Sequence, residues 1–128
     1  MTEQFVPYEL ALKLKEKDFD KPCMYPFDKY FYMDTSYVEF IDWNEKYKNI
    51  DGFCSAPLWQ QVIDWFREKH SIEIWVGNWG IMIRSGLSHK EYEAYVKYRD
   101  ANNTLYSEFF DDYKEARQAA IEQALTLI

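Results

Sequence analysis

The chain has 128 residues, 48% of them hydrophobic and 20% aromatic, and this length predicts one compact domain over residues 1–128. Four glycines and four prolines are too few for a linker-like or collagen-like chain, and the many large apolar side chains argue against intrinsic disorder. Fifteen basic against 22 acidic residues give a net charge of −7, which disfavours binding to nucleic acid.

Neither a membrane span nor a secretory signal is apparent in the sequence. No apolar run approaches the roughly 18 residues that cross a bilayer, and the first residues lack the basic start and apolar centre of a signal peptide. We therefore expect a soluble, cytoplasmic protein. In that compartment Cys23 and Cys54 are expected to stay reduced and to act as small buried hydrophobic residues.

The first third of the chain predicts a helix followed by a hairpin. Pro7 suits a helix start, and apolar residues then recur at helical spacing, which predicts a helix over 7–17. The aromatic segment 23–33 is expected to form an edge strand that Pro26 interrupts. After a turn, residues 37–42 alternate loosely between apolar and polar and are expected to pair with it.

The middle of the chain carries the clearest patterns. Residues 57–70 have a wide apolar stripe opposite polar residues, with Pro57 in the first turn, and predict a helix that lies on a sheet. Residues 72–76 alternate as a half-buried strand does. Residues 77–80 then predict a turn.

The segment 88–99 is consistent with either a helix or a strand. A capping box at Ser88 and Glu91 favours a helix, whereas the alternation of residues 92–98 favours a strand. We favour the strand, because turn-forming residues follow and 105–110 is aromatic enough to return as its partner.

The chain ends in a predicted helix over 113–127, with Asp111 and Asp112 at the positive end of its dipole. The predicted order is α-β-β-α-β-β-β-α. Strands in runs indicate an α+β fold, with a single layer of mostly antiparallel sheet packed by about three helices.

Four blocks of the sequence resemble a set of small proteins of gut Bacteroidetes and their phages and mobile elements. The blocks are FVPYELALKLKE (5–16), DKPC (20–23), SAPLWQQVIDWFREKH (55–70) and YKEARQAAIEQAL (113–125). That set has no assigned reaction, ligand or catalytic residue, so the resemblance implies a setting only. The setting is that of an accessory protein of a phage or an integrated element.

No pattern in the sequence points to catalysis or to a cofactor. The cysteines and the two histidines lie too far apart in the chain for a compact zinc site, so we expect no metal. A dyad of Cys54 and His70 is disfavoured because a helix separates them. Asp111 and Asp112 are better explained as a helix start than as an acid and base pair. No glycine-rich phosphate loop is present.

The aromatic content is the feature that packing alone does not explain. Five Trp, 11 Tyr and nine Phe are more than a core of this size buries easily, because small domains leave about a third of their unfolded surface exposed. Some rings should therefore face water or a partner. The candidates lie on the less apolar side of their elements or in a turn: Trp65, Trp75, Trp79, Tyr95 and Tyr98. The alternative is a two-sided sheet lined by tyrosines with their hydroxyls outward.

Exposed Trp and Tyr with little charge around them are typical of an interface centre, so the leading hypothesis is a non-enzymatic binding or adaptor module. Its partner would be another protein or a second copy, held through the aromatic sheet face or an edge strand. The rival hypothesis is a small-ligand binder or an enzyme with a Trp/Tyr-lined pocket polarised by Asp64, Arg67 or His70. A flat patch would favour the module, and a pocket with convergent polar groups would favour the rival.

Overall fold

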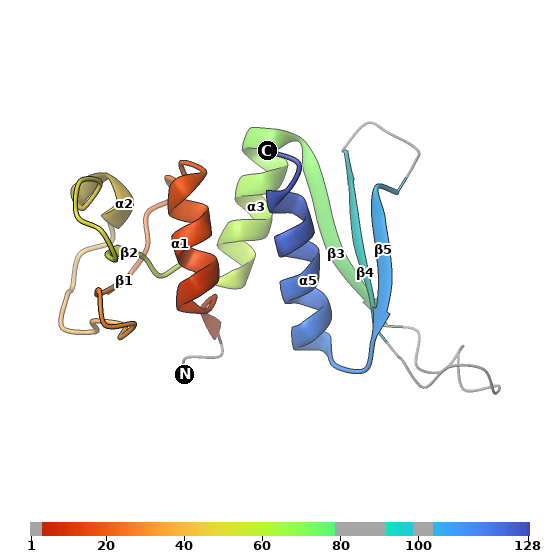
Figure 1. The fold of residues 1–128 in the computed structure, drawn as a ribbon, viewed down its shortest axis with the longest axis horizontal. Helices are drawn as coiled ribbons and strands as arrows, with labels where there is room; N and C mark the ends of the chain where they lie inside the picture. The colour runs from red at the N-terminus through yellow and green to blue at the C-terminus, as the bar shows by residue number, and fades with distance from the viewer. Residues whose placement is uncertain (1–3, 79–91, 99–103) are drawn as a thin grey trace. The chain divides into compact units, whose positions relative to one another are not determined.

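The computed structural model describes residues 4–78, 92–98 and 104–128, which form two compact units, residues 1–65 and 66–128. Within the described residues the structure has four helices, a two-stranded antiparallel sheet and a three-stranded antiparallel sheet, in the order α1 β1 α2 β2 α3 β3 β4 β5 α5 (Figure 1). The α+β class predicted from the sequence is confirmed. The prediction of a single domain stays a prediction.

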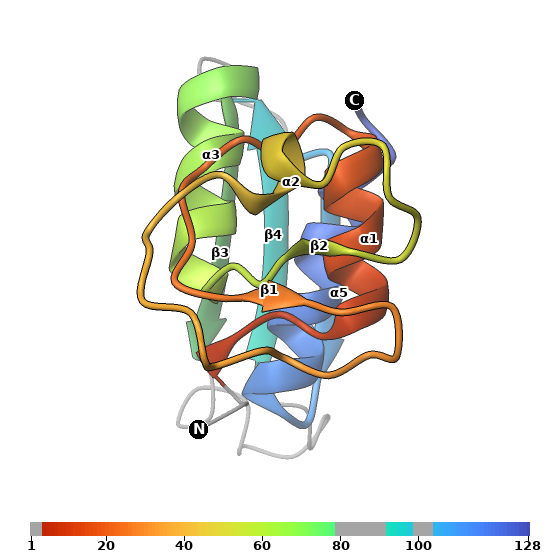
Figure 2. The same ribbon diagram turned by 90° about the vertical axis from the view of Figure 1, so that its left-hand side faces the viewer.

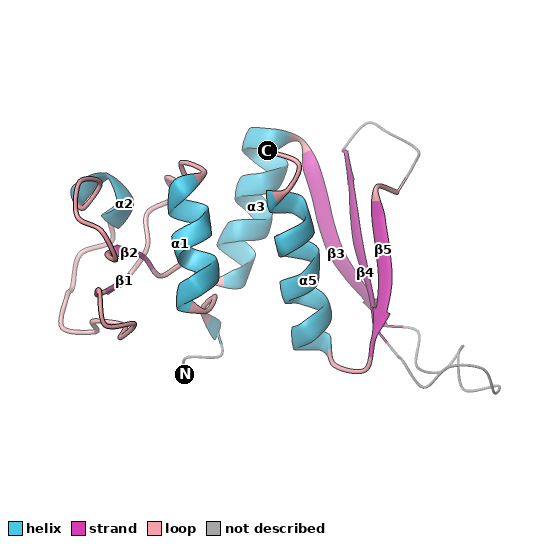
Figure 3. Cartoon of the chain, viewed as in Figure 1, coloured by secondary structure: helices cyan, strands magenta, loops and turns pink. Residues whose placement is uncertain are grey.

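The first unit consists of short elements joined by long connections, as Figure 3 shows. The helix α1 (Tyr8–Glu16) follows Pro7 and buries one apolar face. The strands β1 (Pro26–Phe27) and β2 (Cys54–Ser55) form the small sheet, and α1 packs against β2 (Figure 2). A single turn of helix, α2 (Trp43–Lys46), also contacts β2.

Buried side chains satisfy the backbone groups of these connections where no strand ladder does. The Asn44 amide donates to the Phe19 carbonyl over 2.9 Å and accepts from the Ser55 N–H over 2.8 Å. The Trp43 indole donates to the Cys23 carbonyl over 2.8 Å. Because an unpaired buried polar group is costly, these bonds fix the course of the chain between the elements.

The second unit is a three-stranded sheet covered on one face by a helix. It follows the end of α3 (Trp59–His70), the helix that begins in the first unit. The strands β3 (Ile72–Asn78), β4 (Tyr92–Tyr98) and β5 (Tyr106–Phe110) pair antiparallel in that order. The helix α5 (Tyr113–Leu125) packs against all three strands (Figure 1), and its alanine-rich face is buried.

Most long elements lie where the sequence predicts them. The helices predicted over 7–17, 57–70 and 113–127 correspond to α1, α3 and α5. For 88–99 the strand is confirmed over its described part, because β4 lies between β3 and β5 in the sheet. The capping box at 88 and 91 lies outside the described residues, and so does the second half of the turn predicted at 77–80, whereas its first two residues, Gly77 and Asn78, belong to β3.

Two expectations about the sheet are wrong. The strands divide between two sheets instead of forming one layer. Residues 37–42 form no strand, and the expected hairpin is reduced to an isolated bridge between Cys23 and Ile41. The reason is local hydrogen bonding. The Asp34 carboxylate accepts from the Ser36 N–H, and Asp42 caps α2, so these side chains stabilise turns where a ladder was expected.

Candidate binding surface on the outer sheet face

Strand alternation divides the three-stranded sheet into two faces. Ile72, Ile74, Ala94 and Val96 are buried on the side that α5 covers. The intervening residues point the opposite way, because successive side chains in a strand alternate between faces. This opposite side, here named the outer face, is formed by Glu73, Trp75, Glu93, Tyr95, Lys97, Ser107 and Phe109.

A stacked aromatic pair lies at the centre of the outer face. Trp75 of β3 and Tyr95 of β4 are direct cross-strand partners. Their ring centroids are 4.8 Å apart and the planes are inclined by only 17°. The Lys97 ammonium lies over the Trp75 ring, 5.8 Å from its centroid. The pair remains open to water, since Trp75 is 41% exposed. Such pairs stabilise a sheet while leaving one ring surface available for contact.

Next to this pair, Glu93 is held by neutral hydroxyl groups. Both the Tyr95 hydroxyl and the Ser107 hydroxyl donate to the Glu93 carboxylate. Across the strand pair, Glu93 lies opposite Phe109, which is 38% exposed. Within residues 4–78, 92–98 and 104–128 the carboxylate is therefore bound by hydroxyl groups and by no cation, and it is a hydrogen-bond acceptor of fixed position in the aromatic centre.

At the β3 edge the outer face is charged. Glu73 lies directly opposite Lys97 in the ladder. Its carboxylate also accepts from the Arg67 Nε over 3.0 Å. An apolar centre with a polar rim is the usual anatomy of a protein interface.

Of the five aromatic residues predicted to be exposed, the structure brings Trp75 and Tyr95 together on the outer face. Tyr98 is exposed, but its register opposite Ile72 places it on the other face. Trp79 lies outside the described residues.

The prediction that Trp65 is exposed is wrong, because this side chain is only 1% exposed. Trp65 follows Val62 by three residues in α3, so it continues the buried stripe of that helix. Its ring packs edge-on against Phe19 at 5.3 Å. The spacing from Val62 is consistent with burial, but the apolar stripe predicted from the sequence left Trp65 on the less apolar side of the helix.

The side chains proposed to polarise a pocket all lie on α3. Asp64 accepts from the Gln60 amide one turn earlier, over 2.9 Å, and Arg67 binds Glu73. The His70 ring lies 6.0 Å from that of Phe66. Burial, and then the charge of Lys69, lower the pKa of His70. That these three line a pocket stays a prediction.

One exposed aromatic segment was not predicted from the sequence. Tyr30, Phe31 and Tyr32 are 64%, 68% and 72% exposed and form what is here named the aromatic loop. The Asp28 carboxylate accepts from two backbone N–H groups of this loop, and Phe31 adopts a left-handed backbone with φ of 74°. The available signal was a run of consecutive aromatic residues between aspartates, which neither a strand nor a helix can bury on one face.

Two further properties concern ligands and chemistry. In the described parts of the chain, no group of three or more His, Cys, Asp and Glu side chains is arranged to hold a metal ion.

Cys23 and Cys54 are buried as predicted. Burial raises the pKa of each thiol to about 12, so both thiols stay protonated and are weak nucleophiles at neutral pH.

Comparison with known proteins finds no matching family model, no matching curated protein and no matching solved structure. Among the described residues, no helix has both the length and the apolar composition required to cross a lipid bilayer.

Proposed function

We propose that the protein is a non-enzymatic protein-binding module and that its partner docks on the outer face of the β3–β4–β5 sheet. The observation that carries the proposal is the stacked pair of Trp75 and Tyr95, which stays open to water on the face opposite α5. Trp and Tyr are the residue types most enriched among those that dominate binding energy. Phe109, on the neighbouring strand β5, extends this apolar centre.

The charge of the chain favours a basic partner surface over a second copy. The net charge is −7, so two copies repel each other, whereas a basic protein is attracted. On the outer face itself the Glu93 carboxylate is bound only by hydroxyl groups in the described part of the chain, which suits an additional donor from a partner. A homodimer through this face is therefore the competing outcome of the test.

The proposal extends to the cellular location and the genetic origin of the protein. We place the protein in the cytoplasm as an accessory protein of a phage or mobile element, and its partner among the proteins of the host. The resemblance to small proteins of gut Bacteroidetes and their mobile elements motivates this setting. An acidic module of this kind would act by occupying a surface of the host protein.

The test compares three forms of the full chain in capture from a host lysate. They are the wild type, the double variant Trp75→Ser/Phe109→Ser, and the control Leu127→Ser. Leu127 lies in the same unit beyond α5 and is 36% exposed, close to the 38% of Phe109. Circular dichroism of all three forms establishes that the fold is kept.

We expect host proteins that are retained by the wild type and by Leu127→Ser but are lost with the double variant. Capture of the same proteins by all three forms would overturn the proposal. Sedimentation velocity over a range of concentrations decides the nature of the partner, since self-association that the double variant abolishes would identify a second copy.

A further inference from the structure

Three aromatic rings surround one ammonium group in the first unit. The Lys46 Nζ lies 5.1 Å from the ring centroid of Trp43, 5.6 Å from that of Tyr37 and 5.8 Å from that of Tyr47. All three distances are within the roughly 6 Å over which a cation is attracted to a ring face. These three rings are here named the aromatic cage.

The rings are held in place by contacts with one another. The centroids of Tyr37 and Trp43 are 4.6 Å apart, and Trp43 and Tyr47 are stacked at 6.2 Å with an interplanar angle of 11°. The two tyrosine hydroxyls are hydrogen-bonded to each other over 3.0 Å. The Trp43 indole is anchored by its hydrogen bond to the Cys23 carbonyl. The rings are therefore fixed in position before any ligand arrives, which lowers the entropic cost of binding, and Trp43 is fully buried while Lys46 lies over it.

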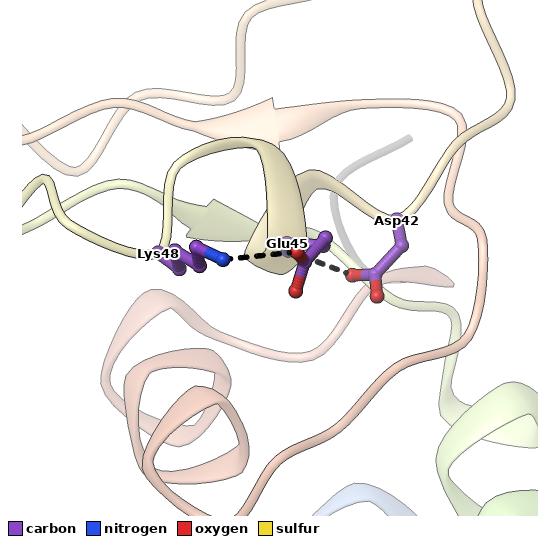
Figure 4. Close-up of polar contacts among 3 residues, drawn as sticks. All are labelled: Asp42, Glu45 and Lys48. Carbon is purple, nitrogen blue, oxygen red and sulfur yellow. Dashed lines mark hydrogen bonds and ion pairs between the residues drawn. The ribbon is translucent and has the colours of Figure 1, made fainter.

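In the single turn α2, Lys46 lies over the rings, whereas the acidic residues Asp42 and Glu45 make other contacts. Asp42 accepts from the backbone N–H of Glu45 over 3.2 Å, and Glu45 pairs with Lys48 over 3.2 Å; Figure 4 shows both contacts. In the part of the chain that the structure describes, Lys46 makes no ion pair with either carboxylate. Among the described residues the contacts of its ammonium are with ring faces, so attraction to the rings holds it in the cage.

We propose that the aromatic cage binds the quaternary ammonium head group of a ligand and that Lys46 occupies the cage in its absence. The primary ammonium of lysine is compact and strongly hydrated, so ring faces replace its water shell poorly. A trimethylammonium head carries the same charge on a larger and less hydrated group, which gains more from three ring faces. The proposal concerns a site in the first unit and is independent of the outer sheet face.

Lys46 weakens binding without preventing it. Lys46 is exposed, so its side chain can leave the rings and be solvated. As a tethered competitor it acts at an effective concentration in the millimolar range or above. Its removal should therefore increase the affinity of the cage for an external cation, which is the reverse of what removal of a ligand-binding residue does.

The experiment titrates three probes into the full-length protein and follows the indole N–H signal of Trp43 by NMR. The probes are choline, the trimethylated lysine derivative Nα-acetyl-trimethyllysine methylamide, and 3,3-dimethylbutan-1-ol, which is the uncharged carbon analogue of choline. The variants are Lys46→Ala, Lys48→Ala as the matched control on the same turn, and Lys46→Ala/Tyr37→Leu, which removes one wall.

We expect both cations to bind and the uncharged analogue not to bind. Lys46→Ala should bind choline at least about fivefold tighter than the wild type, Lys48→Ala should equal the wild type, and loss of Tyr37 should weaken binding about tenfold or more. Binding of trimethyllysine alone would identify a methylated protein side chain as the ligand, and equal binding of choline would show that the head group suffices. Equal shifts with the uncharged analogue, or no gain in affinity in Lys46→Ala, would overturn the proposal.

Discussion

Lys15 is the residue on which the connection between α2 and β2 depends. Its ammonium donates to the carbonyls of Tyr47, Ile50 and Phe53, over 2.9, 3.1 and 2.6 Å. The Ile50 and Phe53 carbonyls are thus satisfied by one side chain from α1, and the Tyr47 carbonyl accepts from it in addition to the Ile50 N–H, over 3.0 Å. Hydrogen bonds to a charged group contribute more than neutral ones, and carbonyls left without donors carry a desolvation cost.

Substitution of Lys15 should therefore destabilise the first unit. Lys15→Met keeps most of the apolar stem and removes the three donors, and we expect the free energy of unfolding to fall by about 2 kcal/mol. Lys13→Met, on the exposed side of α1, is the control and should change it by less than about 0.5 kcal/mol. Urea unfolding followed by circular dichroism measures both, and equal losses in the two variants would refute this role.

The two buried thiols make the protein less stable in alkaline solution. Burial raises the pKa of Cys23 and of Cys54 to about 12, from an ordinary value of about 9. The unfolded chain therefore releases these protons first as the pH rises. Between these two values the free energy of unfolding should fall with pH, by up to about 1.4 kcal/mol per pH unit for each thiol. Below pH 9 this contribution to stability is fully present.

Urea unfolding at several pH values from about 8 to about 11 tests this, with the double variant Cys23→Ala/Cys54→Ala as the comparison. The wild type should lose stability more steeply than the variant, because other groups such as Tyr8 titrate in both. Parallel pH profiles for the two proteins would show that the thiols do not titrate as proposed.

At the scale of elements, the packing of α5 depends on small side chains. Ala116, Ala120 and Ala124 are fully buried on the face of α5 that packs against the sheet. Small residues at successive turns let the helix approach the strands closely, so little room is left for a larger side chain.

Ala120→Leu should overpack this contact and lower the free energy of unfolding by about 2 kcal/mol. Gln123→Leu adds a leucine to the exposed side of the same helix and should change it by less than about 0.5 kcal/mol. Thermal or urea unfolding of the two variants gives the comparison. A leucine tolerated equally at both positions would mean that α5 does not pack closely on the sheet.

The elements that the sequence predicts well are those with a long hydrophobic period. α1, α3 and α5 each carry a continuous apolar face, and β3 alternates over its length. The elements that it does not predict are α2 and β2, of four and two residues, and of the edge strand predicted within 23–33 only the two residues of β1 form. Their positions depend on tertiary hydrogen bonds such as those of Asn44 and Asp42, which no local pattern reveals.

The contrast between local sequence pattern and tertiary contact also explains which candidate site residues the sequence predicts. Trp75 and Tyr95 are detectable because each lies on the polar side of an alternating strand. Trp65 is placed wrongly because it was assigned to the less apolar side of its helix, whereas the buried side of α3 includes it. The aromatic cage is not detectable, since Tyr37, Trp43 and Tyr47 come together only after α2 turns the chain.

At the scale of the whole molecule, net charge should control the rate of association. With a net charge of −7, attraction to a basic partner is long-ranged at low salt and is screened within about 10 Å at 0.1 M salt. The association rate constant with the captured partner should fall several-fold between about 50 mM and about 500 mM NaCl, with a smaller change in the dissociation rate. Surface plasmon resonance measures both, and an association rate that is independent of salt would argue against a basic partner.

The most direct test of a partner on the outer face is site-specific photocrosslinking in host cells. p-Benzoylphenylalanine is introduced in place of Phe109 on the outer face or, as the control, in place of Leu127 beyond α5. We predict a covalent adduct with another protein from position 109 after irradiation and none from position 127. No adduct from position 109, or the same adduct from both positions, would contradict a partner bound on this face.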